Sequence, residues 1–195
     1  MQIYKKGKRG LIYFSKYKNK KIIIKIKNPE SRAENRIENE FRFLKILNKK
    51  NIGPKALFFK NGKLGMEFID GIYFLDFIEK ENNKNIILKM IKTLYDQLYQ
   101  LDKLKINKEE MSHPHKHIII TKHNKPVLVD FERAHYIERP ANVTQFSVFL
   151  VSDFVSELLK EKSIKINRKE MIESCKIYKN NINDNNFLRI IRQIE

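Results

Sequence analysis

The sequence contains a single cysteine, Cys175, in 195 residues. One cysteine cannot form a disulfide within the chain, and it cannot supply the ligands of a Cys-rich zinc site. Long apolar runs are also missing, since none approaches the roughly eighteen residues needed to span a bilayer, and the basic N-terminus has no apolar signal core. These absences predict a soluble protein of a reducing compartment, the cytoplasm, with no membrane partner.

Internal repeats, Ser/Pro-rich linkers and disordered low-complexity blocks are absent from the sequence as well. With 42% hydrophobic residues, a chain of this length can bury a substantial core. We therefore expect one domain or two small lobes.

Positive charge is the feature that the sequence has in excess. Forty basic residues against 23 acidic ones give a formal net charge of +17, and lysine greatly outnumbers arginine. Such a charge attracts polyanions at long range, so contact with RNA or with the ribosome is one hypothesis. The alternative is a compositional bias, because the basic residues are spread along the whole chain and accompany many isoleucines and asparagines.

Residues 1–27 read as three strands, with a turn at residues 18–20 between the second and third. Gly7 and Gly10 lie in a basic loop before the second strand, where backbone N–H groups could approach phosphates; an ordinary turn is the alternative. Lys25 stands among isoleucines in the third strand. Because a desolvated ammonium group is costly without an anion, Lys25 must point to solvent or meet a carboxylate or phosphate.

Residues 31–50 are predicted to form a helix. Ser31 and Glu34 have the spacing of a capping box, and apolar residues recur at helical spacing on one face: Ile37, Phe41, Leu44 and Leu47. Glu40 falls on or beside that apolar stripe and is expected to face inward. Glu38 falls on the solvated side.

Further elements are predicted beyond residue 53. Residues 56–60 and 63–68 should form a hairpin with a type I′ turn at Asn61 and Gly62. An amphipathic helix is predicted for residues 84–102, and three further helical patterns lie near 142–161, 168–180 and 184–194. The predicted core positions of the 84–102 helix are Ile87, Met90, Ile91, Leu94, Leu98 and Leu101.

The stretch from 107 to 134 combines two short apolar runs, 118–120 and 127–129, with a turn-rich segment between them. Glu110 precedes the first run, and Asp130 follows the second. The two runs read as a hairpin that would carry separated acidic groups to one edge of a cleft.

The order of these parts resembles the protein kinase superfamily over about residues 3–160. The segment GKRGLIY, from Gly7 through Gly10, is similar to a shortened glycine-rich loop, with Ile12 in the place of the apolar residue that covers adenine. The segment IIIK ends at Lys25, which resembles the strand lysine of the family, and Glu40 resembles its helix partner. The segment MEFI resembles the hinge.

The same resemblance assigns further roles. It makes the Glu67 carbonyl and the Ile69 N–H the adenine contacts, and it places Asp130 of VDFE on magnesium. Glu110 stands for the catalytic Asp and His117 for the metal-binding Asn, although they are separated by seven residues rather than the family's five. Glu132 replaces the glycine of the metal-binding motif.

The resemblance is greatest to archaeal predicted Ser/Thr kinases related to the RIO kinases and to the kinase subunit of the KEOPS complex. It implies an α+β, two-lobed kinase-like fold, with residues 1–69 as the N-terminal lobe and 70–195 as the C-terminal lobe. ATP and Mg²⁺ would be the cofactors. The reaction would be phosphoryl transfer to a protein hydroxyl, on a substrate or on the protein itself, or ATP hydrolysis used as a switch.

Other functions stay open at this point. A catalytically silent, ATP-gated binder of RNA or the ribosome is one, and a small-molecule phosphotransferase is another. The run of His113, His115 and His117 also allows a zinc site, a loop that contacts phosphates or bases, or a polar loop without a ligand.

Overall fold

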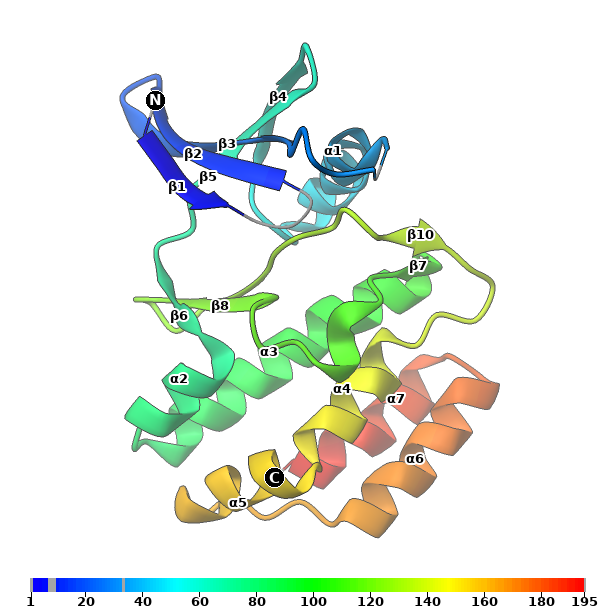
Figure 1. Ribbon diagram of the computed structural model, residues 1–195. Helices are drawn as coiled ribbons and strands as arrows, with labels where there is room; N and C mark the ends of the chain where they lie inside the picture. Colours follow the sequence, from blue (N-terminus) through cyan, green and yellow to red (C-terminus); the bar gives the residue numbers. More distant parts are fainter. Residues whose placement is uncertain (1, 7–9, 33, 195) are drawn as a thin grey trace. The chain divides into compact units, whose positions relative to one another are not determined.

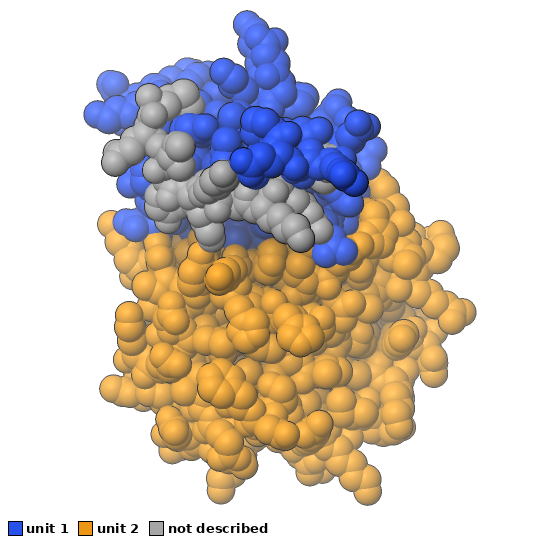
Figure 2. Space-filling model, viewed as in Figure 1, with its two compact units in different colours: residues 1–70, 128–134 blue, residues 71–127, 135–195 orange. Residues whose placement is uncertain are grey.

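The computed structural model of the protein describes residues 2–6, 10–32 and 34–194, and it separates into two compact units (Figure 2). Unit 1 comprises residues 1–70 together with 128–134, and unit 2 comprises residues 71–127 and 135–195. Unit 1 is thus assembled from two separate stretches of the chain. Sheets and helices occur together, which confirms the α+β class.

Unit 1 contains a five-stranded antiparallel sheet with the strand order β1-β2-β3-β5-β4 (Figure 1). Its strands are β1 (Gln2–Lys6), β2 (Gly10–Tyr17), β3 (Lys20–Lys27), β4 (Ala56–Lys60) and β5 (Lys63–Glu67). The three N-terminal strands and the 56–68 hairpin are therefore confirmed. Asn61 and Gly62 have φ angles of 51° and 70°, as a type I′ turn requires.

Helix α1 (Arg36–Leu47) packs against β3, β4 and β5, and a short 3-10 helix, η1 (Asn48–Lys50), continues it. The predicted start at Ser31 is wrong. The Ser31 N–H donates to the Asn28 carbonyl, and the Glu30 N–H donates to the Asn28 side chain, so this segment forms a turn instead. Local side-chain bonding by asparagine competes with helix formation in this way.

The buried face of α1 differs by one aromatic residue from the prediction. Ile37, Leu44 and Leu47 are buried, as expected. Phe43, which was not predicted, is fully enclosed. Phe41 is half-buried at the edge of the face, where its ring stacks on Phe59.

Unit 2 is mainly helical. Its helices are α2 (Phe74–Lys80), α3 (Lys84–Lys103), α4 (Asn142–Leu150), α5 (Asp153–Glu161), α6 (Arg168–Asn180) and α7 (Asp184–Ile191), followed by η3 (Arg192–Ile194). All six predicted core positions of α3 are buried. The single helical pattern at 142–161 is broken into α4 and α5 because Ser152 has an extended backbone.

Two small sheets connect the helices of unit 2. Strands β6 (Gly71–Tyr73), β8 (Ile118–Thr121) and β9 (Pro126–Leu128) form one sheet, and β7 (Ile106–Asn107) pairs with β10 (His135–Tyr136) in the other. The strands β8 and β9 confirm the predicted apolar runs, although β9 begins one residue earlier. A one-turn 3-10 helix, η2 (Glu110–Ser112), lies between β7 and β8.

Candidate functional site

The buried ammonium group of Lys25 is the centre of a charged cluster in unit 1. Its Nζ donates to Glu40 Oε2 at 2.7 Å and to Asp130 Oδ1 at 2.8 Å. It forms a third ion pair with Glu132 Oε2 at 3.0 Å. The Lys25 side chain is only 7% exposed, so this lysine meets anions rather than solvent.

Glu40 reaches the cluster from α1 and is 2% exposed, which confirms the prediction that it faces inward. Its second carboxylate oxygen, Oε1, accepts a hydrogen bond from the Phe131 N–H at 3.2 Å. Both oxygens of Glu40 are therefore used within unit 1, one by Lys25 and one by the 130–134 segment. Glu38 is exposed, also as predicted.

Asn39, the residue before Glu40 in α1, binds backbone carbonyls of the same 130–134 segment. Its side-chain Nδ2 donates to the Glu132 carbonyl at 3.1 Å and to the Ala134 carbonyl at 2.9 Å. Two consecutive helix residues thus fix residues 130–134 against α1. Nothing in the sequence distinguishes Asn39 as a site residue, because an asparagine in a helix carries no distinctive signal.

Asp130 has a left-handed backbone, with a φ angle of 66°. Non-glycine residues adopt this conformation infrequently, although aspartate tolerates it better than most. In this conformation the Asp130 carboxylate contacts Lys25, and the Asp130 side chain remains 38% exposed. The side chains of Glu40 and Glu132 are only 2% and 8% exposed. Asp130 is the most accessible acid of the cluster.

Opposing effects set the protonation of the cluster. Burial alone would lower the pKa of Lys25, but attraction to Glu40, Asp130 and Glu132 outweighs it and raises that pKa. Burial also raises the pKa of Glu40, and repulsion from Asp130 adds to this, while Lys25 and the Phe131 N–H act in the opposite direction. Lys25 is therefore a stable cation at neutral pH.

The carboxylates of the cluster also fit a metal ion. Glu40, Asp130 and Glu132 each offer an oxygen, and these atoms lie within 4.8 Å of one another. Oxygen donors are the ligands that Mg²⁺ prefers. With all three carboxylates ionised beside one ammonium group, the formal charge of the cluster is two negative, which a divalent cation would balance. Glu132 is a ligand candidate that the sequence analysis did not select.

The strand register places Ile12, one of the predicted nucleotide contacts, on the same face of the sheet as Lys25. Ile12 lies directly opposite Lys25, and Ile23 lies between Phe14 and Met66 on the neighbouring strands. Residues opposite each other in an antiparallel pair share a face. An apolar surface therefore lies beside the charged cluster.

Gly10 allows β2 to pass close to Lys25. A Cβ atom at Gly10 would lie 3.3 Å from Lys25 Cε and 3.3 Å from the Ile26 carbonyl oxygen, a distance tighter than most contacts of this kind. Gly7, the other predicted loop glycine, lies outside the described residues.

The predicted hinge residues follow the end of β5. Glu67 is the last residue of β5 and pairs with Ile22. Its N–H donates to the Lys55 carbonyl, and its side chain accepts from the Lys55 N–H. Ile69 is half-buried just beyond the strand. Their adenine contacts stay a prediction.

The other predicted site residues, Glu110 and His117, belong to unit 2, where they converge on Lys108. Lys108 Nζ lies 3.2 Å from Glu110 Oε2 and 3.4 Å from His117 Nδ1. The Lys108 side chain is 0% exposed. Because the sequence contains many lysines, no pattern distinguishes Lys108 as a site residue.

A buried polar network fixes the backbone of this loop. Asn142, at the start of α4, accepts from the Lys108 N–H and donates to the Ile106 carbonyl. Asp102, near the end of α3, accepts from the backbone and side chain of Asn142 and from Tyr178. Burial raises the pKa of Asp102 to about 6, although these donors lower it.

The histidine run does not form a zinc site in the described part of the chain. The group of potential ligands found there contains only the three carboxylates around Lys25. His113 contacts Ser112, and the His115 ring lies edge-on against Phe149. These contacts favour the polar-loop interpretation.

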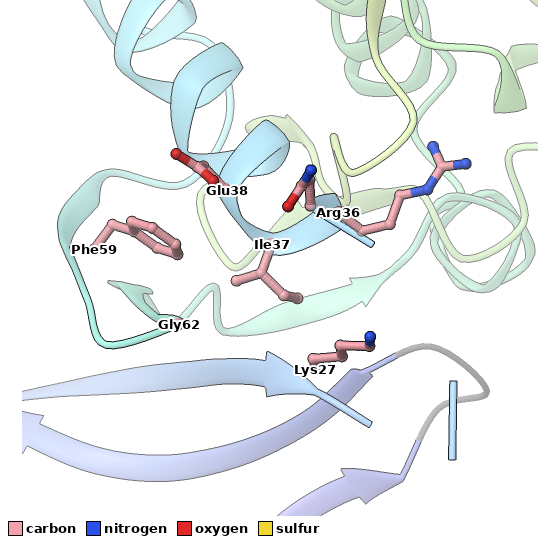
Figure 3. Close-up of a pocket in the computed structure, with 7 residues that line it drawn as sticks. Lys27, Arg36, Ile37, Glu38, Phe59 and Gly62 are labelled. Atoms are coloured by element: carbon pink, nitrogen blue, oxygen red, sulfur yellow. The ribbon is translucent and has the colours of Figure 1, made fainter. Parts of the chain in front are cut away.

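A separate cavity of about 320 Å³ lies at the N-terminal end of α1. Ile37 points toward Lys27, and the Arg36 guanidinium extends away (Figure 3). The residues that line this cavity are Lys27, Asn35, Arg36, Ile37, Glu38, Phe59 and Gly62. The cluster residues Lys25 and Glu40 do not line it.

Comparison of the chain with protein-family models and with curated proteins finds no match to either. Among the described residues, no helix has both the length and the apolar character needed to cross a membrane.

Proposed function

We propose that the protein binds ATP with Mg²⁺ on unit 1 and transfers the terminal phosphoryl group to a hydroxyl, as an atypical, RIO-like protein serine/threonine kinase. In this proposal the fold is two-lobed and kinase-like. The observation that carries it is the enclosed Lys25 ammonium with three carboxylates beside an apolar strand face.

The charge balance of the cluster supports a requirement for metal. Three carboxylates around one ammonium repel a polyphosphate, so ATP alone should bind poorly. Mg²⁺ would balance this charge and neutralise the phosphate oxygens during transfer. Asp130 and Glu132 are best suited to hold it, because both oxygens of Glu40 already accept hydrogen bonds from Lys25 and Phe131.

The other side chains have separate roles in the proposal. Lys25 donates to phosphate oxygens, and Glu40 orients Lys25. Gly10 gives a backbone approach to the phosphates, and Ile12 covers the base. Glu110 orients the acceptor hydroxyl, since phosphoryl transfer gains mainly from alignment and charge stabilisation.

One observation favours the alternative of a silent ATP-gated binder. Glu110 Oε2 accepts from a fully buried lysine, so this oxygen is already engaged. Positioning matters more than basicity in this reaction, so we place phosphoryl transfer first. Turnover measurements separate the two functions.

Saturating MgATP is expected to stabilise the folded protein. At a hundredfold excess over the dissociation constant the gain in unfolding free energy is about 2.7 kcal/mol. ATP without Mg²⁺ should give a much smaller gain. The measurement is the melting temperature with ATP, with Mg²⁺ and with both.

Two variants and one control sharpen this test. Asp130→Asn should make the stabilisation by ATP insensitive to Mg²⁺, and Lys25→Met should weaken it. Lys27→Met, an exposed position two residues along the same strand, should behave as the parent. A melting temperature unchanged by millimolar MgATP would contradict the nucleotide site.

A further inference from the structure

Helix α1 packs on the face of the unit 1 sheet that carries Lys25. Phe41 of α1 stacks on Phe59 of β4. Phe59 lies opposite Leu64, which lies opposite Lys25 on the next strand. Because successive residues of a strand point to opposite faces, Phe58 points to the second face. Within the described part of unit 1 the helices are α1 and its continuation η1, so no other helix of this unit covers the second face.

Aromatic rings lie across the second face. One row runs over four strands and consists of Tyr13, Ile24, Gly65 and Phe58, each opposite the next. The Phe58 ring rests on the backbone of β5, since a Cβ atom at Gly65 would overlap it. Tyr17, four residues after Tyr13 on the same strand, is 41% exposed, and its ring centroid lies 5.8 Å from that of Phe58. Tyr13 and Phe58 are half-buried, so part of each ring is accessible.

Exposed lysines lie at both ends of the second face. Lys18 and Lys20 belong to the β2–β3 turn, where the Lys18 ammonium lies 5.7 Å from the centroid of the Tyr17 ring. Lys60 and Lys63 flank the β4–β5 turn, at the other end of β3, and lie directly opposite each other. Like charges in an opposed pair destabilise a sheet, and a bound anion would offset that cost.

The charge of unit 1 also favours a polyanion. Unit 1 contains 20 basic and 8 acidic residues, a formal +12 of the +17 of the whole chain, although it has fewer residues than unit 2. Strands β2 to β5 contain one acid, Glu67, whose carboxylate accepts a hydrogen bond from the Lys55 N–H. The second face is therefore aromatic and apolar at its centre and positive at its ends.

We propose that the second face of this sheet binds single-stranded nucleic acid. Bases stack on the rings of Tyr13, Tyr17 and Phe58, and the lysines of the two turns hold the phosphates. Stacking of this kind tolerates any sequence, because every base has a π face, whereas an acidic peptide or an anionic surface would use the lysines alone. The bases of a duplex are stacked on one another and cannot use the rings. The site is separate from the proposed nucleotide site, because it lies on the opposite face from Lys25.

The role of the rings is tested with a fluorescently labelled oligouridylate of about twelve nucleotides, a length within the usual span of single-stranded sites. Tyr17→Leu keeps an apolar side chain and removes the ring, so it should weaken binding roughly five- to a hundredfold, the range for one lost base–aromatic stack. Tyr17→Phe keeps the ring and should bind as the parent does. Equal affinity of Tyr17→Leu and the parent in an anisotropy titration would overturn the proposal.

The role of the lysines is tested by the salt dependence of the same titration. Lys60→Gln combined with Lys63→Gln should lower the slope of log affinity against log salt by about 1.4, because each phosphate contact to a single strand contributes about 0.7. Lys45→Gln combined with Lys49→Gln removes the same charge from exposed positions of α1 and η1 and should keep the slope of the parent. An equal decrease in both double variants would show that binding follows net charge alone, against the proposal.

Three further probes test the class of ligand. Tighter binding of the oligouridylate than of an oligothymidylate of the same length would identify RNA, and equal binding would identify single strands of either sugar. A duplex of that length should bind more weakly, and its affinity should be insensitive to Tyr17→Leu. Binding to phosphatidylserine-containing vesicles without binding to either oligonucleotide would replace nucleic acid with a membrane surface.

Ultraviolet cross-linking of the parent locates the site without any variant. Cross-links to the oligouridylate should fall on Tyr13, Tyr17 or Phe58. Saturating MgATP at constant ionic strength should leave the affinity for the oligonucleotide unchanged. Cross-links around Lys25, or displacement by MgATP, would contradict a site on the second face. A melting temperature unchanged by MgATP contradicts only the proposed function and leaves this surface standing.

Discussion

At the scale of single residues, the buried ionisable groups of this protein are each surrounded by specific partners. Lys25 has three carboxylates, and Asp102 accepts hydrogen bonds from Asn142, Val143 and Tyr178. Removing one partner of such a group leaves a charge without compensation, which costs more than the contact itself is worth. The same burial makes the stability of the protein depend on pH.

The stability contributed by Asp102 should fall as pH rises from about 4 to about 6. Its pKa is raised from 3.8 to about 6 in the folded protein, so the folded state holds a proton that the unfolded state releases earlier. The contribution is complete below pH 4 and lost above pH 6. Urea unfolding across this range, in the parent and in Asp102→Asn, measures it.

Asp102→Asn should be less stable than the parent, but its stability should not fall between about pH 4 and pH 6. Tyr178→Phe removes a hydrogen-bond donor to the Asp102 carboxylate. It should therefore raise the pKa of Asp102 further and shift the loss of stability to higher pH. An identical pH profile for parent and Asp102→Asn would show that Asp102 does not titrate in this range.

At the scale of elements, α1 organises the cluster of unit 1 by holding a segment that is distant in sequence. Asn39 and Glu40 contact the backbone of residues 130–134, and Phe131 is fully buried. Gly53 is part of the same packing, since a Cβ atom there would lie 2.8 Å from Leu44 and 3.0 Å from Phe131. The position of Asp130 therefore depends on a helix, and not only on its own strand.

Asn39→Ala should lower both stability and MgATP affinity. Two buried or half-buried carbonyls lose their donor, which costs about 1 to 3 kcal/mol, and the segment that carries Asp130 gains freedom. Chemical unfolding and a MgATP titration measure the two effects. Arg42→Ala, which removes an exposed hydrogen bond to the side-chain oxygen of Asn39 and a cation–π contact with Phe43, is the control. Lost stability with unchanged MgATP affinity would show that fixing the 130–134 segment does not contribute to nucleotide binding.

At the scale of the whole molecule, the net charge of +17 is the dominant property. It favours encounters with any polyanion, but lysines spread along the chain give no single basic segment. A functional RNA surface and a compositional bias predict different salt dependence, because only a surface with many phosphate contacts releases many counterions.

If the charge serves RNA binding, affinity for a structured RNA should fall by about a thousandfold or more between 50 and 200 mM salt. Compositional bias predicts weak binding with a shallow slope. A filter-binding or fluorescence titration at several salt concentrations decides between them. Absence of binding at low salt would remove RNA as a partner.

Several site features were predictable because they depend on neighbours in sequence. Lys25 among isoleucines had either to point to solvent or to meet an anion, and the helical spacing placed Glu40 inward. Asn39, Lys108 and Glu132 were not predictable, since their partners are fixed by contacts with segments far along the chain. The false helix start at Ser31 arose because a local Asn28 turn outweighed the capping pattern.

The sequence by itself determined the strands of the N-terminal sheet, the Asn61-Gly62 turn, the long helix α3 and the α+β class. These follow from periodicity and turn chemistry, which act over a few residues. Only the tertiary structure decided that residues 128–134 join the first unit and that Asp130 and Glu132 share Lys25 with Glu40. Burial and charge pairing act between residues that are close in space, and a linear pattern does not record those distances.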